Sequence, residues 1–473
     1  IDDTFHNHHA CMGVGGNYSA RSIGAIPPGH GVVWSTKKHI GKAGSGMTVG
    51  NFFQNLWVGT EQRGLLWYGT DDRGWVPNDA IAAHTIVRAH NATTIRNHLI
   101  GTYPGQEPFV LDAARTVSFS YNASPFKRLT RGWRINQRSA ANGFTKKPRY
   151  KWNWDTGKEY FSILSPPFRK RARWDEYYKH CGEVAANMSK RGIYGPGIRM
   201  RPYLTNQIAV RGYMRKSLEN NIYNYFAADW ETTDSGETLN KTYRDYMMWL
   251  QHRQVTEGGC RHFYYDISMC GRISRQLVAG NGYILPDGRI QPSGTDWQLR
   301  KWYMRANALM QDNGIYPCGI SGHATNTIPL VVLPFSDAIL DSEFPMKDPI
   351  TVFPSDRMIA LSCPHNFGCN INHLGFMNSA WAGMHDAGKG GGHGSLFDRA
   401  EWRNWGIERD DIAFIPYWRN DHVVRRIGEG LLCSLWKRPP RPGTAQPGSV
   451  IVGILNHGPD KEGFEQTRAC ELV

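Results

Sequence analysis

The chain lacks the features that mark several well-known classes of protein. No apolar run in its 473 residues approaches the ~20 that a membrane-spanning helix needs, and the longest, 328–335, contains proline. Its nine cysteines form no Cys-x-x-Cys pair, which argues against a structural zinc site. No nucleic-acid-binding fingerprint is present either. We therefore expect a globular protein with no metal, no cofactor and no nucleic acid partner.

The composition is instead rich in aromatic residues, glycine and positive charge. The chain has 17 Trp, 21 Tyr and 51 Gly, and its 55 Lys and Arg against 41 Asp and Glu give a net charge of +14. Basic residues concentrate in 127–138, 146–151 and 169–173. Such a field attracts polyanions, and an acidic polysaccharide fits the aromatic richness, although a solvated basic surface without a partner is an equal alternative.

Cysteines and glycosylation sequons weakly favour export. Cys363 and Cys369 are close enough in sequence to be bridged in an oxidising compartment, and five Asn-x-Ser/Thr sequons are present. The chain begins Ile-Asp-Asp with no signal-like segment, which suggests a processed or trimmed protein. We expect a secreted, extracellular or periplasmic location.

The length predicts two or three domains. Short β-prone runs separated by Gly, Pro and Asp turns fill 31–121, which predicts an N-terminal β-sandwich domain over 1–135. Two further β-prone runs, 431–436 and 450–455, flank a proline-rich turn. They predict a short C-terminal β-domain over 426–473, which is too small to be a full sandwich.

Helix and strand patterns alternate between these β regions. The helical patterns cover 174–188, 241–255 and a segment from Asp296 to 313–314; the strand-like runs are 198–204, 261–266, 316–320, 338–341, 358–363 and 412–418. Alternation of this kind is typical of βα units around a parallel sheet. We therefore predict a central (β/α)8-type barrel over 136–425.

Two acidic residues at the ends of predicted strands suggest catalysis. Asp266 ends the run His-Phe-Tyr-Tyr-Asp, and Asp341 and Glu343 end a second strand about seventy residues later. Active sites of parallel barrels lie at the carboxyl ends of the strands, and two carboxylates there can cleave a glycosidic bond. Asp266 is the expected nucleophile or base, and Glu343, beside Phe344 and Pro345, the expected acid, with Asp341 as its competitor. The alternative is that Asp266 caps a turn and Glu343 is solvated.

Further residues near these acids are candidates for binding the substrate. Trp230 offers a surface on which a sugar ring can stack, and His323 ends a strand-like run, although both have ordinary structural roles as alternatives. The full set of expected substrate-binding residues is His323, Trp230, Tyr264, Tyr265, Asp229, Glu231 and Arg300.

Several motifs occur in an order that resembles a known family. These are Asn-Leu-Trp-Val-Gly at 55–59, Glu-Gln-Arg-Gly-Leu-Leu-Trp at 61–67, Tyr-Tyr-Asp at 264–266 and Phe-Ser-Asp-x3-Asp-Ser-Glu at 335–343. Together they resemble large glycoside hydrolases related to the β-N-acetylgalactosaminidases. Characterised members carry an adjacent Asp-Glu pair, whereas Asp266 is followed by Ile267, so the resemblance does not imply their substrate-assisted mechanism.

The sequence therefore predicts a glycoside hydrolase that acts on a polysaccharide or glycan, either neutral or anionic, through carboxylates at the barrel rim. Two alternatives remain open at this point. One is a non-catalytic carbohydrate-binding or structural protein that retains the barrel. The other is a polysaccharide lyase that uses Tyr and His, with Arg neutralising the uronate.

Overall fold

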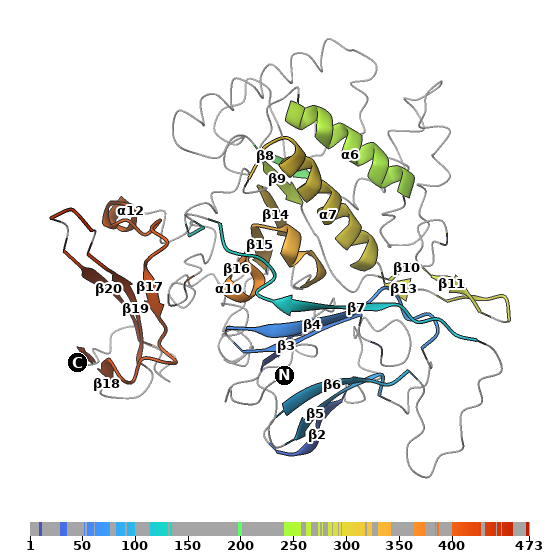
Figure 1. Cartoon of the computed structure of the whole chain (residues 1–473), viewed down its shortest axis with the longest axis horizontal. Helices are drawn as coiled ribbons and strands as arrows, with labels where there is room; N and C mark the ends of the chain where they lie inside the picture. Colours follow the sequence, from blue (N-terminus) through green and yellow to red (C-terminus); the bar gives the residue numbers. More distant parts are fainter. Residues whose placement is uncertain are drawn as a thin grey trace, which may run out of the picture.

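The computed structural model describes a large part of the chain. The described residues are 9–11, 29–35, 52, 54–60, 62–75, 82–89, 92–99, 114–130, 133–134, 197–200, 241–256, 262–265, 273–274, 277, 282–285, 287–291, 293–294, 296–316, 319–323, 330–341, 364–373, 384, 386, 400–426, 431–440, 442–445, 447–456 and 470–472. They form two N-terminal antiparallel sheets, a central parallel sheet with two long helices, and a C-terminal group of strands (Figure 1).

The two N-terminal sheets are antiparallel throughout. The first has the order β1-β3-β4-β7, and its strands are His9–Cys11, Asn55–Gly59, Gly64–Gly69 and Phe119–Ser124. The second has the order β2-β5-β6, and its strands are Gly31–Ser35, His84–Ala89 and Ala92–Asn97.

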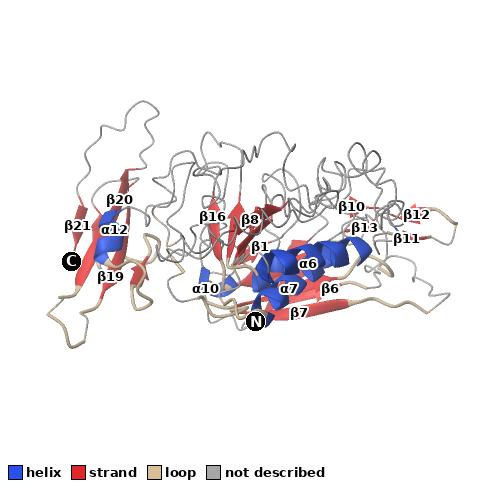
Figure 2. Ribbon diagram, turned by 90° about the horizontal axis from the view of Figure 1, so that it is seen from above, coloured by secondary structure: helices blue, strands red, loops and turns tan. Residues whose placement is uncertain are grey.

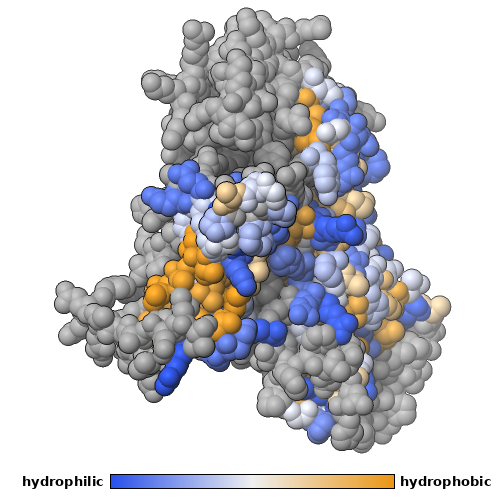
Figure 3. Space-filling model, turned by 60° about the vertical axis from the view of Figure 1, so that its left-hand side comes forward, coloured by the Kyte–Doolittle hydropathy of each residue, from blue (hydrophilic) through white to orange (hydrophobic). Residues whose placement is uncertain are grey.

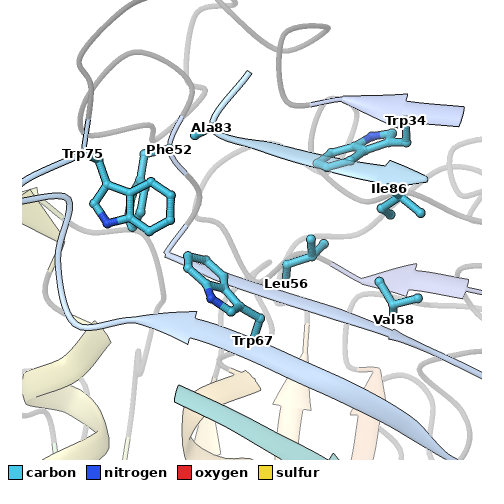
Figure 4. Close-up of a cluster of buried hydrophobic side chains, with 8 residues drawn as sticks. All are labelled: Trp34, Phe52, Leu56, Val58, Trp67, Trp75, Ala83 and Ile86. Carbon is cyan, nitrogen blue, oxygen red and sulfur yellow. The ribbon is translucent and has the colours of Figure 1, made fainter. Parts of the chain in front are cut away.

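An aromatic core joins these two sheets. Trp34 and Ile86 from the second sheet face Leu56, Val58 and Trp67 from the first (Figure 4). Phe52, Trp75 and Ala83 complete the cluster. Leu56 and Val58 of β3 both face this core because successive side chains of a strand alternate between its two faces.

Glycine is required where β3 turns into β4. A Cβ atom added at Gly64 would lie 2.6 Å from the indole ring of Trp57, and one at Gly59 would lie 2.4 Å from it. Trp57 is fully buried and donates its indole N–H to Ser124 Oγ at 3.2 Å. The two glycines therefore leave the space in which this large ring packs.

The central sheet has five parallel strands in the order β16-β15-β14-β9-β8. In chain order they are Gly197–Met200, His262–Tyr265, Ile320–His323, Ala338–Asp341 and Asn370–His373. Helices α6 (Lys241–Thr256) and α7 (Asp296–Asp312) lie side by side against it (Figure 2). The end of α7 is set by Gly314, whose φ of +69° suits glycine.

The predicted (β/α)8 barrel is wrong for the described part of the chain. Within it the parallel sheet is open, with β8 and β16 as its outer strands, and every other sheet is antiparallel. The run 412–418, expected as the last barrel strand, contains β17 (Ala413–Ile415), which pairs antiparallel with β19. Alternating helix and strand signals indicate a parallel sheet, but closure depends on strand number and stagger, which local patterns do not report. The expected helix 174–188 and strand 358–363 lie outside the described residues.

The C-terminal strands form two small sheets. β19 (Leu431–Arg438) is central between β17 and β20 (Ser449–Asn456), while β18 (Val424–Arg426) pairs with β21 (Cys470–Leu472). Trp436 packs against Ile407 and Trp402 beside helix α12 (Ala400–Trp405). Val450 and Ile454 on β20 are exposed, and Figure 3 shows an apolar surface over this sheet.

Short elements complete the description. They are β10 (Ile273–Ser274), β11 (Tyr283–Ile284), β12 (Ile290–Gln291), β13 (Ser293–Gly294), the 3-10 helix η6 (Leu330–Phe335) and α10 (Pro364–Phe367). In the portion of the chain that the structure describes, no helix is both long and apolar enough to cross a membrane.

Hydrogen bonds join the first N-terminal sheet to the parallel-sheet region. Asn55 Nδ2 donates to Asp296 Oδ2 at 2.7 Å at the start of α7. Ser124 Oγ donates to Asn366 Oδ1 at 3.3 Å, just before β16. All four residues are buried, so the two regions share a polar seam that excludes water.

Candidate active site at the carboxyl edge of the parallel sheet

Polar and titratable residues end neighbouring strands of the parallel sheet. β14 ends at His323, β15 at Asp341 and β16 at His373. Asp341 and His373 are register partners, and His323 is the register partner of Leu340, one position before Asp341. Parallel strands place their carboxyl ends at the same edge, so these three backbone positions lie together there.

Tyr265, the last residue of β9, is held in the core below this edge. Its ring lies 5.8 Å from Trp302 and 5.0 Å from Tyr303, both in edge-to-face geometry on α7. Its hydroxyl donates to Gln251 Oε1 on α6 at 3.0 Å, and neither residue is exposed to solvent. Tyr265 therefore packs between β9 and the two helices. The sequence analysis expected it to contact the substrate instead.

Close packing continues on the neighbouring strand. A Cβ atom at Gly322 would lie 2.3 Å from Tyr303 Oη and 3.0 Å from Ile339 Cδ1. Gly322 therefore lets α7 approach β14 at the residue before His323. This close contact holds the end of β14 against α7.

The structure places the remaining expected site residues unevenly. Tyr264, His323 and Asp341 lie in β9, β14 and β15, where the backbone is described. The expected residues outside the described part of the chain are Asp266, Glu343, Trp230, Asp229 and Glu231. Asp266 directly follows Tyr265 in the chain, and Glu343 comes two residues after Asp341.

His373 was missed by the sequence reasoning. The segment Asn370-Ile-Asn-His373 alternates polar and apolar residues only over its first three positions, and the strand is four residues long. The sequence analysis predicted a strand at 358–363 and none at 370–373. A titratable residue at the end of this alternation was the signal that could have identified it.

Arg300 lies away from the carboxyl edge. It is on α7, and its guanidinium carbon is 4.9 Å from the ring centre of Phe335, 5.3 Å from that of Tyr68 and 5.5 Å from that of Trp297. Phe335 precedes the start of β15, so this contact is at the amino side of the sheet. The structure therefore does not bring Arg300 together with His323 and Asp341.

Asp337 also lies at the amino edge, immediately before β15. Its Oδ1 pairs with Lys127 Nζ at 3.1 Å, and both side chains are about one-fifth exposed. Nearby, Cys369 is a free and fully buried thiol whose pKa is raised by burial. Cys369 is thus a free thiol and does not form the bridge with Cys363 that the spacing would permit.

Two residues of the first basic cluster are neutralised inside the protein. Lys127 pairs with Asp337, and Arg134 forms a bidentate ion pair with Asp386 in which both distances are 2.8 Å. The side chains of Arg134 and Asp386 are only 4% and 3% exposed. These two cations therefore add little to an outward field that attracts polyanions.

Within the described residues, no group of three or more His, Cys, Asp or Glu side chains is arranged to hold a metal ion. Comparison of the chain with models of known protein families gives no match, and comparison with curated proteins also gives none.

Proposed function

We propose that the protein is a glycoside hydrolase whose reaction takes place at the carboxyl edge of the parallel sheet. The observation that carries this proposal is the convergence of Asp341, His323 and His373 on neighbouring strand ends. Ligand-binding residues of parallel α/β sheets lie on the loops that follow the carboxyl ends of the strands. In the sequence, Asp266 directly follows β9 and Glu343 comes two residues after the end of β15.

The sheet order supports a reaction with two separated acids. β9 and β15 are separated by β14, so their backbones are two strand spacings, or roughly 10 Å, apart. An inverting reaction needs a carboxyl separation of roughly 6.5–9.5 Å, which leaves room for a water molecule between sugar and base. We therefore propose that hydrolysis proceeds by direct attack of water, with inversion at the anomeric carbon.

In this proposal each acid has a separate role. Asp266, as the carboxylate base, takes a proton from the attacking water. Glu343 gives a proton to the oxygen of the leaving sugar, and Asp341 is the competitor for this role. The C–O bond to the leaving group breaks as the new C–O bond to water forms, and the two acids exchange protonation states.

Three single variants test the assignment, namely Asp266→Asn, Glu343→Gln and Asp341→Asn. Each is assayed for reducing ends released from a panel of neutral and anionic polysaccharides. Loss of a general acid or base lowers kcat by roughly 10²- to 10⁴-fold. An acid variant should recover most of its rate on aryl glycosides with good leaving groups, because these do not need protonation, whereas a base variant should not.

Asp312→Asn is a matched control, because Asp312 is an exposed acid at the far end of α7. It should retain the wild-type rate. Full activity of Asp266→Asn on the best substrate would refute the role of that residue. Binding without released reducing ends would instead identify a non-catalytic carbohydrate-binding protein, and an unsaturated product would identify a lyase.

A further inference from the structure

The N-terminal sheets carry an exposed aromatic pair far along the chain from the acids. Phe119 and Tyr121 on β7 are 43% and 47% exposed, and their ring centres are 5.8 Å apart in edge-to-face geometry. β7 is an outer strand of its sheet within the described residues. Exposed apolar side chains that lie together can mark a binding surface.

The register explains why the rings are uncovered. Tyr121 is the partner of Trp67, so it lies on the face that carries the core, on an outer strand of the sheet. Phe119 is the partner of Gly69, which has no side chain to lie beside the ring. A Cβ atom at Gly69 would lie 2.9 Å from Phe52, so the core requires glycine at this position.

A chain of hydrogen bonds from the core holds Tyr121 in place. His84 is fully buried among the rings of Phe52, Trp67 and Trp75, at centroid distances of 5.3, 4.4 and 5.4 Å. Its Nδ1 lies 2.9 Å from Asn97 Oδ1, and Asn97 Nδ2 donates to Tyr121 Oη at 3.1 Å. The tyrosine hydroxyl accepts this bond and keeps its own proton to donate outward.

We propose that Phe119 and Tyr121 form a carbohydrate-binding surface that is separate from the carboxyl edge of the parallel sheet. Two rings set at an angle offer flat faces for the C–H side of a pyranose, while the Tyr121 hydroxyl and the second N–H of Asn97 bond to sugar hydroxyl groups. Because the rings are already ordered, binding costs little conformational entropy. A glycan matches this mixture of aromatic faces and polar groups better than a purely apolar partner does.

The strand register shows how Arg96 lies relative to this surface. Arg96 on β6 is exposed, and it is the cross-strand partner of Thr85 in β5. His98 bonds to the same Thr85 at 3.0 Å, and its pKa is lowered by burial and by Arg96. Side chains alternate along a strand, so Arg96 lies on the opposite face of β6 from Asn97 and does not place its charge beside the aromatic pair; neutral and anionic glycans are therefore both tested.

Affinity gel electrophoresis of the full chain tests this site. Native gels are cast with mixed-linkage β-glucan, xylan, galactomannan or chondroitin sulfate, and the retardation gives a dissociation constant for each. At least one polysaccharide should retard the wild type, and Tyr121→Ala or Phe119→Ala should weaken this binding roughly 10- to 100-fold, the range for losing a stacked ring. Retardation measures binding without turnover, so the result does not depend on the proposed hydrolysis.

Two further variants separate a binding role from a change in folding. Tyr121→Phe keeps the ring but loses the hydroxyl, so its affinity should fall between wild type and Tyr121→Ala. Tyr316→Ala removes a tyrosine that is 68% exposed in the turn after α7, and it should bind like wild type. The proposal is overturned if no gel retards the wild type, if both alanine variants at the pair bind normally, or if Tyr316→Ala weakens binding as much as they do.

Discussion

Replacing Asp386 with alanine should destabilise the protein strongly, because Asp386 neutralises a buried cation. Arg134 donates from Nε and Nη2 to the two oxygens of Asp386, each at 2.8 Å. Trp436 Nε1 donates to Oδ1 of the same carboxylate at 2.9 Å. Arg134 also donates to the backbone oxygens of Arg409 and Ile412, each at 3.3 Å, so one ion pair links the segment at 134 to the C-terminal strands.

The magnitude follows from the burial of both groups. Their side chains are 4% and 3% exposed, so water cannot replace the lost carboxylate. Removing one partner of a buried ion pair costs roughly 3–5 kcal/mol, since the other charge is left uncompensated. Asp386→Ala also leaves the Trp436 indole N–H without its acceptor. We expect the loss to lie near the upper end of that range.

Urea unfolding followed by tryptophan fluorescence measures this loss as a shift of the midpoint. The double variant Arg134→Met/Asp386→Leu removes both charges, so it should recover most of the stability that Asp386→Ala loses. Asp287→Ala is the control, because Asp287 pairs with Arg289 in the exposed β11–β12 hairpin, and it should leave the midpoint unchanged. If Asp386→Ala shifts the midpoint no more than Asp287→Ala does, the reasoning about burial is refuted.

Three smaller predictions concern other packed or hydrogen-bonded residues. Gly64→Ala should cost about 1–3 kcal/mol by overpacking, because its new Cβ would lie 2.6 Å from the Trp57 ring, and urea unfolding measures it. Tyr265→Phe should cost about 1–3 kcal/mol, because the fully buried Gln251 Oε1 loses the hydroxyl it accepts from, and wild-type stability of this variant would count against the bond. His98 should titrate below 6.5 by NMR, because burial and a neighbouring arginine lower its pKa. The neutral form of His98 is favoured in the folded state, so its contribution to the free energy of unfolding is fully present above pH 6.5 and is lost as the pH falls through the lowered pKa. His98→Gln should remove this pH dependence.

The candidate site was predictable from the sequence only in part. The strand ending at Asp341 and the helices starting at 241 and Asp296 are confirmed, because each has a local signal in periodicity or capping. The strand predicted at 316–320 is found at Ile320–His323. Gly319, Gly322 and Cys318 interrupt the alternation of polar and apolar residues that would mark its bounds. His373 was missed because a four-residue strand carries too little periodicity to be recognised alone.

The roles of Tyr265 and Arg300 show what sequence patterns do not contain. Both residues were expected to touch substrate, and the residue types alone support that. Tyr265 instead packs under α7, and Arg300 lies on three aromatic rings at the amino side of the sheet. The partners of each residue come from distant parts of the chain, so its surroundings exist only after folding.

The sequence by itself determined which segments form strands and helices in most of the described regions, because propensity, alternation and capping act over a few neighbouring residues. Tertiary structure alone decided whether the parallel strands close, which sheet receives β17, and which charges are paired. Those outcomes depend on contacts such as Arg134 with Asp386, which are 252 residues apart in the chain. Such contacts form by burial and geometric fit, which local sequence does not encode.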